Sequence, residues 1–430
     1  MSRRAPAELT RGIRRFDMIF LATNLIIGGG IYGLPSRVFG VAGPWSILAF
    51  PLCAVITGLV VLCYAEMASR FDGPGGPYLY AHYTFGPLPG FMVGWLLWTA
   101  RMASFTTVVS ILLDYLGYLW PAAAPGPWRT AVGVSILVLY TTLDLLPVRL
   151  SAIFSSVITV AKLLPLAVFV AIGAFYVRLV PASFGPLPRP AAAASTILLV
   201  SFAFSGFESA SVLAGETKDA RRALPLALLA AIGTATLIYT GVQLVCVGTF
   251  PGLAASTSPL ADASARFFGP WAGRMIALGA VVSAGGSLYA MMLSVPRLPY
   301  SMARQGLLPP FLAATHPRFH IPHAAVLITS AGMLYVFLTG TFLSALTFSL
   351  VARLAAYTCT LIGLLVLRRR PAAPPALFRA PGGPVAPVLA LVFCFWLLLG
   401  AKPRDLYSGA LAAGAGLAVY GIGLWQRRRA

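Results

Sequence analysis

The stretch NLIIGGGIYGLPS, Asn24 to Ser36, lies inside an apolar run that is long enough to cross a lipid bilayer. It contains four glycines and a proline, and both residue types interrupt regular helices. A break at membrane depth frees backbone N–H and C=O groups that lipid cannot satisfy, so it persists only inside protein or beside a water-filled cavity. Close packing of helices through small residues is the alternative explanation for these glycines.

The whole chain has the composition of an integral membrane protein. Of its 430 residues, 59% are hydrophobic and 10% are charged, which is too apolar for a soluble globular protein. Apolar runs of membrane-spanning length recur with no long soluble segment between them, and about twelve spans are predicted. Their approximate ranges are 16–38, 44–69, 88–118, 129–145, 150–177, 194–214, 223–249, 273–300, 322–339, 343–367, 385–400 and 407–425.

The net charge of +20 is distributed as expected for a membrane topology rather than for nucleic-acid binding. With twelve spans, most of the lysines and arginines fall in loops and tails on the same side as the N-terminus. The positive-inside rule therefore predicts a cytoplasmic (inner) membrane protein with both tails, 1–15 and 426–430, in the cytoplasm. We expect contacts with membrane lipid and none with nucleic acid.

No cofactor, metal site or enzyme chemistry is predicted. The five cysteines lie in apolar runs without CxxC spacing, and His316, His320 and His323 have no carboxylate or cysteine nearby in the sequence. The glycine-rich loops lack the GK[ST] ending of a phosphate-binding loop, and no serine, histidine and acid pattern suggests a hydrolase.

A second break is predicted in span 6, which reads LLVSFAFSGFESASVLAGETK and carries Ser205, Gly206 and the ionisable Glu208 within its apolar run. Spans 1 and 6 are five spans apart, so they occupy corresponding places in two five-span halves. Because five is odd, the halves would be inverted relative to one another, as in secondary transporters with a midplane site between discontinuous helices. Such helix ends suit a zwitterionic amino acid, since N–H groups face its carboxylate and carbonyls face its ammonium group.

The chain resembles the amino acid/polyamine/organocation (APC) permeases. IIGGGIYGLP is similar to the GSGIF..P stretch of that family, and FSGFESASVLAGETKDARRALP is similar to its sixth-span motif. The loop YAEMASRFDGPGGPYLYAHYTFGPLPGFMVGW and the segment SVPRLPYSMARQGLLPPFLAATHPRFHIPHAA extend the resemblance through span 10.

The resemblance implies an all-α, LeuT-type fold with two inverted repeats and two further helices. The repeats would cover 16–177 and 194–367, and spans 11 and 12 would cover 385–425. It also implies a substrate site at the two breaks. There, Gly28, Gly29 and Gly30 meet the carboxylate, and the carbonyls of Ile26, Phe202 and Ser205, next to Gly206, meet the amino group. Phe202 either closes over the substrate, as an aromatic in the family does, or packs in the core.

Three ionisable residues inside spans are candidates for the transport mechanism, because charges are costly in hydrocarbon. Lys162 either exchanges a proton during transport or is a static charge that ties span 5 to carbonyls of the broken span 1. The family resemblance places it where sodium-coupled relatives bind sodium, which implies a sodium-independent mechanism. Glu208 either carries the coupled proton, pairs with a cation, or makes a structural hydrogen bond to span 8. Arg101 either pairs with Glu208, binds an acidic substrate side chain bidentately, or lines a water-filled vestibule, and it disfavours a cationic substrate.

The predicted function is sodium-independent proton symport of an amino acid, neutral or small, by alternating access. An exchanger of amino acids or amines is the alternative, and a non-transporting sensor of the same fold is a further one. Arg353, in span 10, is expected to pair within the protein.

Overall fold

The computed structural model describes residues 13–71, 75–123, 126–145, 151–179, 184–212, 217–316 and 321–429. Within these ranges the chain is almost entirely helical, has no strand, and forms one isolated bridge between Ile13 and Thr217. This confirms the predicted all-α class. Most of the predicted N-terminal tail and His320 lie outside the described residues.

The helices follow the predicted spans closely. Their bounds are α1 Arg15–Ile26, α2 Gly30–Ala42, α3 Ser46–Arg70, α4 Pro77–Phe85, α5 Pro87–Leu119, α6 Gly126–Asp144, α7 Ser151–Gly173, α8 Pro190–Ala203, α9 Phe207–Val212, α10 Ala220–Thr249, α11 Pro259–Phe268, α12 Pro270–Ser294, α13 Arg297–Arg304, α14 His323–Thr339, α15 Phe342–Arg369, α16 Val385–Leu399 and α17 Pro403–Arg429. Short 3-10 turns extend several of them, including one at Gly43–Trp45 between α2 and α3.

Seven helical segments in the described ranges are long and apolar enough to cross a membrane. Shorter apolar helices at Lys162–Tyr176, His323–Thr339 and Val385–Leu399 coincide with predicted spans 5, 9 and 11. Large apolar side chains cover much of the outer surface, such as Leu399 at 83% exposure and Leu237 at 77%. A surface of this kind suits hydrocarbon rather than water, so the chain is a multi-pass membrane protein.

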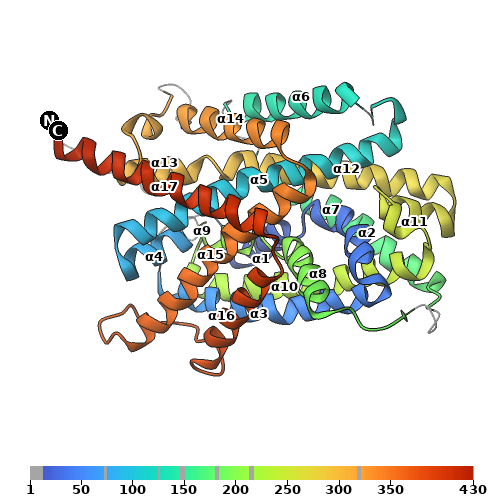
Figure 1. The fold of residues 1–430 in the computed structure, drawn as a ribbon, viewed down its shortest axis with the longest axis horizontal. Helices are drawn as coiled ribbons and strands as arrows, with labels where there is room; N and C mark the ends of the chain where they lie inside the picture. The colour runs from blue at the N-terminus through green and yellow to red at the C-terminus, as the bar shows by residue number, and fades with distance from the viewer. Residues whose placement is uncertain are drawn as a thin grey trace.

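Both predicted breaks are present. Span 1 consists of α1 and α2 with Ile27 to Gly29 between them, and span 6 consists of α8 and α9 with Phe204 to Gly206 between them. In Figure 1, α1, α8 and α9 lie toward the middle of the molecule. Predicted span 8, 273–300, lies within one apolar segment, Pro270–Arg304, which is interrupted between α12, ending at Ser294, and α13, beginning at Arg297. Pro296 stands between them and has no N–H to continue the helix.

Two helical hairpins repeat one local sequence. The helix α4 turns into α5 at Phe85-Gly86-Pro87-Leu-Pro-Gly90, and α11 turns into α12 at Phe268-Gly269-Pro270-Trp-Ala-Gly273. In both, the first glycine ends one helix with a positive φ, +95° and +90°, and the proline begins the next. In both, a Cβ on the second glycine would lie within 3.0 Å of the preceding short helix: 2.7 Å from His82 Cβ in one, 2.9 Å from Ala261 O in the other.

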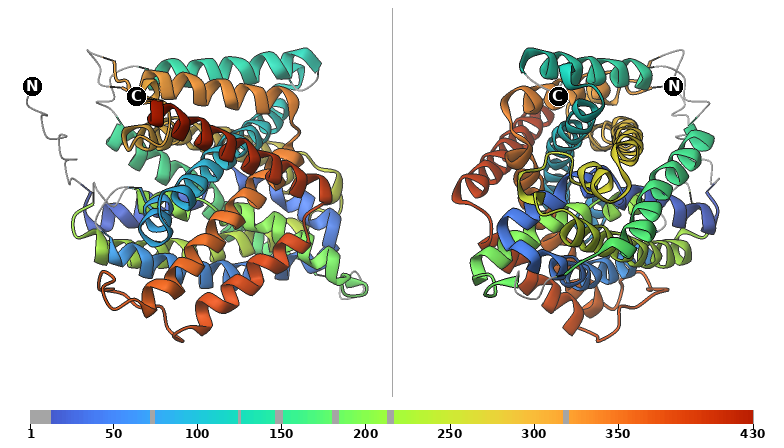
Figure 2. Two further views of the ribbon diagram at one scale, coloured as in Figure 1. Left: turned by 60° about the vertical axis from the view of Figure 1, so that its left-hand side comes forward. Right: turned by 90° about the vertical axis from the view of Figure 1, so that its right-hand side faces the viewer.

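The remaining spans surround the two broken spans. Figure 2 shows α6 and α14 side by side along one edge of the molecule in both views, and they contact each other. The helices α16 and α17 follow α15 and pack on it. Among the long apolar segments of the described ranges, Pro403–Trp425 of α17 is the most exposed, because only 6% of its most apolar stretch is buried inside the protein.

Candidate functional site

The two helix breaks touch each other, and glycine is required at the contact. Gly206 has φ +112°, and a Cβ at this position would lie 2.2 Å from the carbonyl oxygen of Leu25. On the other side, a Cβ on Gly30 would lie 3.2 Å from the ring of Phe202. The two breaks therefore pack against each other. Close approach, like backbone freedom, explains why positions 30 and 206 are glycine.

One tyrosine bridges the breaks. The hydroxyl of Tyr239, on α10, lies 3.0 Å from the carbonyl oxygen of Ile26 and 3.1 Å from that of Ala203. Its side chain is fully buried. Since a hydroxyl has one proton, it donates to one of these carbonyls at a time.

A cavity lies at the breaks. It encloses about 640 Å³, part of it open to solvent, and α1, α2, α5, α7, α8, α9, α12 and α15 contribute to its wall. Nine of the ten residues predicted for the site line it: Ile26, Gly28, Gly29, Gly30, Arg101, Lys162, Phe202, Ser205 and Gly206. Glu208 lies behind this wall, with its carboxylate bonded to lining residues.

The cavity offers backbone groups of both kinds. The helix α2 begins at Gly30, with Gly29 before it and no side chain capping the turn. The N–H of Tyr32, in the first turn, donates to the Gly29 carbonyl at 3.0 Å, so the N–H groups of Gly30 and Ile31 are those that suit an anion. Two of the carbonyls predicted to bind an amino group already accept hydrogen bonds: Ile26 from Tyr239, and Phe202 from the N–H and hydroxyl of Ser205 at 3.2 and 2.7 Å.

Lys162 is buried between three helices. Its Nζ donates to Asn24 Oδ1 of α1 at 2.7 Å and to Ser287 Oγ of α12 at 2.9 Å. The side chain is 1% exposed, and both partners are neutral. Lys162 thus contacts the broken span through a side-chain amide, whereas the tie weighed from the sequence ran to backbone carbonyls.

Glu208 is the centre of a buried charge cluster. Arg353 donates to its Oε1, Arg101 donates to the same oxygen at 3.4 Å, and Tyr357 donates to its Oε2 at 3.1 Å. The N–H of Gly206 also donates to Oε2 at 3.0 Å, which joins the cluster to the break. The pairing considered for Arg101 with Glu208 is present, and the strongest interhelical partners of Glu208 come from α15 rather than span 8.

The guanidinium groups of Arg101 and Arg353 differ in their surroundings. Arg353 donates from all three nitrogens, to Glu208, to Ser104 Oγ at 2.9 Å and to Ser349 Oγ at 3.2 Å. Arg101 donates through Nη2 alone, to Glu208 and Ser209. In the described part of the chain, no acceptor reaches Nε or Nη1 of Arg101, and 12% of its side chain is exposed.

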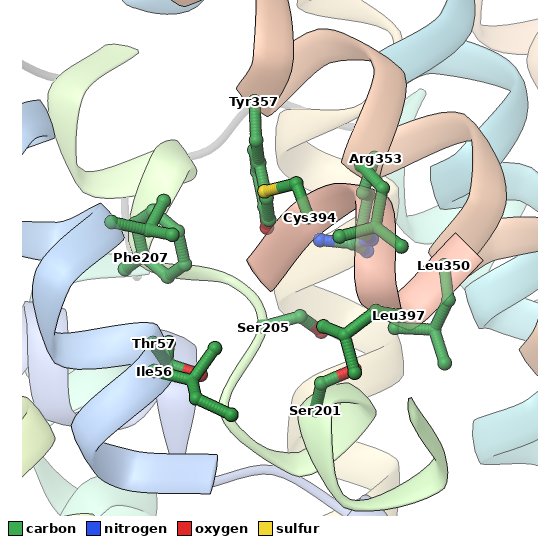
Figure 3. Close-up of a pocket in the computed structure, with 12 residues that line it drawn as sticks. Ile56, Thr57, Ser201, Ser205, Phe207, Leu350, Arg353, Tyr357, Cys394 and Leu397 are labelled. Carbon is green, nitrogen blue, oxygen red and sulfur yellow. The ribbon is translucent and has the colours of Figure 1, made fainter. Parts of the chain in front are cut away.

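A second cavity of about 400 Å³ lies behind Arg353. Figure 3 shows Arg353 and Tyr357 projecting from α15 on one side of it, Ile56 and Thr57 from α3 on the other, and Ser205 below. Most of its wall is apolar, including Leu350, Leu354 and Leu397. Ser205 and Arg353 line both cavities, so they form the partition between them.

The main cavity reaches one end of the bundle at Ser294, the exposed last residue of α12. At the opposite end of α12, its first turn packs on the end of α5 at Tyr118, and Asp114 of α5 is the centre of an ion-pair cluster. Asp114 pairs with Arg129 of α6 at 2.8 Å and with Arg37 of α2 at 3.6 Å, and Arg37 lies 4.0 Å from the ring of Phe342.

Sequence patterns did not identify Tyr239, Asn24, Ser287 or Tyr357 as part of the site. Each is a common residue within an apolar helix, and only the packing of helices distant in sequence brings it to the breaks. Among the described residues, no group of three His, Cys, Asp or Glu side chains is placed to hold a metal ion.

Comparison with known proteins gives a consistent result. The profile of the amino acid permease family matches residues 13–421. The methylthioribose transporter of Bacillus subtilis (strain 168) is 29% identical, over 96% of this chain and 93% of its own. The branched-chain amino acid permease of the same organism is 28% identical, over 91% of this chain and 88% of its own. The mouse Asc-type amino acid transporter 1 is 28% identical, over 94% and 79%.

Proposed function

Because this chain belongs to the amino acid permease family, we propose that it is a secondary transporter that carries a small amino acid across the cytoplasmic membrane by alternating access. The observation that carries this proposal is that both helix breaks line one cavity, which also reaches the exposed end of α12 at Ser294.

The substrate would bind between the breaks. Its carboxylate would take the N–H groups at the start of α2, around Gly28 to Gly30, where the helix dipole also favours negative charge. Its ammonium group would compete for the carbonyls of Ile26 and Phe202, displacing the hydroxyls of Tyr239 and Ser205 that now donate to them. Phe202, packed on Gly30, is positioned to cover the bound molecule.

Lys162 is our candidate for proton coupling. Its two partners, Asn24 and Ser287, are neutral, so its charge can change without breaking an ion pair. Proton transfer at Glu208 would instead disturb its bonds to Arg353, Arg101 and Tyr357. An ammonium group between α1, α7 and α12 also fills a place where a cation would otherwise be needed, which supports sodium-independent transport.

Alternating access would move one group of spans against the other. The matching hairpins α4–α5 and α11–α12 support two repeats, 16–177 and 194–367, because each follows the second span of its half. With the termini in the cytoplasm, the cavity mouth at Ser294 faces inward and the Asp114 cluster closes the outer side. The structure would then correspond to an inward-facing state.

The test is uptake of labelled amino acids into proteoliposomes containing the purified protein. We expect accumulation in empty vesicles under an inward proton gradient, unchanged when sodium is replaced by choline. Lys162→Gln should bind substrate but lose accumulation driven by the gradient, because it keeps hydrogen-bonding ability and cannot carry a proton. Arg222→Gln, which removes an exposed charge from the surface, is the matched control.

Each result distinguishes a mechanism. Uptake only into vesicles preloaded with amino acid would replace symport by exchange. Full gradient-driven accumulation by Lys162→Gln would exclude the lysine as the coupling residue. Binding without any uptake by the wild-type protein would favour a sensor and contradict transport.

A further inference from the structure

We infer that the transported amino acid carries an anionic side chain, and that Arg101 binds it. This inference rests on the proposed function, since it takes the cavity at the breaks to be the amino acid site. It departs from the neutral side chain expected from the sequence and is carried by the charges of the cavity.

The wall of the cavity is positive. Three cationic side chains line it, Arg101, Lys162 and Arg353, and none of its lining residues is acidic. Glu208, behind the wall, balances one of these charges. The cavity is therefore left with at least one uncompensated positive charge even if Lys162 has lost its proton, and a bound molecule of net negative charge would balance it.

The surplus charge lies on Arg101. Arg353 has an acceptor at each of its three nitrogens and pairs at short range with Glu208, so its hydrogen-bonding capacity is used within the protein. Arg101 shares the same carboxylate oxygen at the longer distance of 3.4 Å. Its Nε and Nη1 carry three N–H donors, and among the described residues no acceptor reaches them.

Arg101 is also separated from the place of the α-carboxylate. Its guanidinium group donates to Ser209 and Glu208 of α9. The backbone N–H groups proposed for the α-carboxylate belong instead to the start of α2. Both features line the same cavity, so one molecule with two carboxylates can meet both. A guanidinium group binds carboxylates through paired N–H groups, which gives both charge and orientation. A cationic side chain would be repelled by the same residue.

The wild-type protein tests this inference with matched substrates of nearly equal size. Unlabelled aspartate is compared with asparagine, and glutamate with glutamine, for inhibition of the uptake of a labelled amino acid into proteoliposomes at neutral pH. In at least one pair, we expect the half-inhibitory concentration of the acidic member to be at least about tenfold lower than that of the neutral member. A charge-assisted hydrogen bond would provide a difference of this size.

Two variants assign the selectivity to Arg101. Arg101→Gln should reduce or invert the preference for the acidic member while uptake of the neutral member continues, which also shows that the variant is folded. Arg101→Lys keeps the charge without the planar fork and should retain part of the preference. Arg222→Gln removes one positive charge from the surface and should leave the preference unchanged.

The outcomes separate this inference from the proposed function. Transport of neutral amino acids by the wild-type protein with no preference for acidic ones would overturn the inference and leave the transporter intact. An acidic preference that survives in Arg101→Gln would overturn the role of Arg101. No uptake of any amino acid would contradict the proposed function itself. If Arg101→Gln is inactive toward every substrate, the wild-type comparison and Arg101→Lys decide.

Discussion

At the scale of single residues, the site depends on backbone contacts that only glycine permits. Gly206 stands where span 6 unwinds, with a positive φ and the carbonyl of Leu25 against its α-carbon. Its N–H also donates to Glu208. One residue therefore joins the break in span 1, the break in span 6 and the buried charge cluster.

Gly206→Ala should be strongly damaging. The left-handed backbone alone costs about 1–3 kcal/mol for a residue with a side chain, and the added Cβ would lie 2.2 Å from Leu25 O. We expect a lower apparent melting temperature in detergent and loss of uptake. Gly414→Ala on α17, where no atom lies within 4 Å of the added Cβ, is the control and should behave as wild type. A stable, active Gly206→Ala protein would refute the contact between the breaks.

At the scale of elements, the hairpins α4–α5 and α11–α12 use the same turn. A glycine with positive φ ends the short helix, a proline begins the long one, and a second glycine allows the two to pack closely. The proline supplies the fixed φ that suits a first helical position, where its missing N–H is not needed. The same solution at corresponding places in the two halves is what a duplicated five-span unit would produce.

Gly86→Ala and Gly269→Ala should therefore destabilise the protein to a similar extent, about 1–3 kcal/mol each. No atom lies within 4 Å of the added Cβ at either position, so the cost comes from φ alone. Gly40→Ala, equally uncrowded but with ordinary helical φ, isolates that effect. Thermal unfolding followed by circular dichroism measures it. Clearly unequal effects of the two substitutions would argue against equivalent turns.

At the scale of the whole molecule, an ion-pair cluster connects several helices at one end of the bundle. Asp114 connects α5 to α2 and α6, and Arg37 extends the contact to Phe342 of α15. These helices come from both predicted repeats, so opening this side requires the cluster to separate. The other side has the mouth of the cavity at Ser294.

Asp114→Asn should favour opening on the closed side. It weakens two partly exposed ion pairs, each worth up to about 1 kcal/mol, so the outward-open population should rise by up to about thirtyfold. The measurement is labelling of Ala290→Cys in the cavity by a membrane-impermeant maleimide added outside, with the native cysteines alone as background. Asp219→Asn, which removes an exposed surface pair, should not change the rate. An unchanged rate in Asp114→Asn would show that the cluster does not control access.

The sequence by itself determined the all-α membrane class, most helix bounds and the positions of both breaks. These follow from composition, from the length of apolar runs and from glycine and proline, all of which act locally. It also identified Lys162, Arg101 and Glu208, because an ionisable residue stands out in an apolar run.

Only the tertiary structure decided what these residues meet. Tyr239 reaches both breaks from α10, and Arg353 and Tyr357 bind Glu208 from α15. Among the described residues, no acceptor reaches Nε or Nη1 of Arg101 beside the positive cavity. Most of these contacts join residues more than a hundred positions apart, and neither periodicity nor composition specifies how distant helices pack. The charge balance of the cavity depends on that packing, so the sequence left an acidic substrate at Arg101 as one of three alternatives, and the structure supplies the reason to favour it.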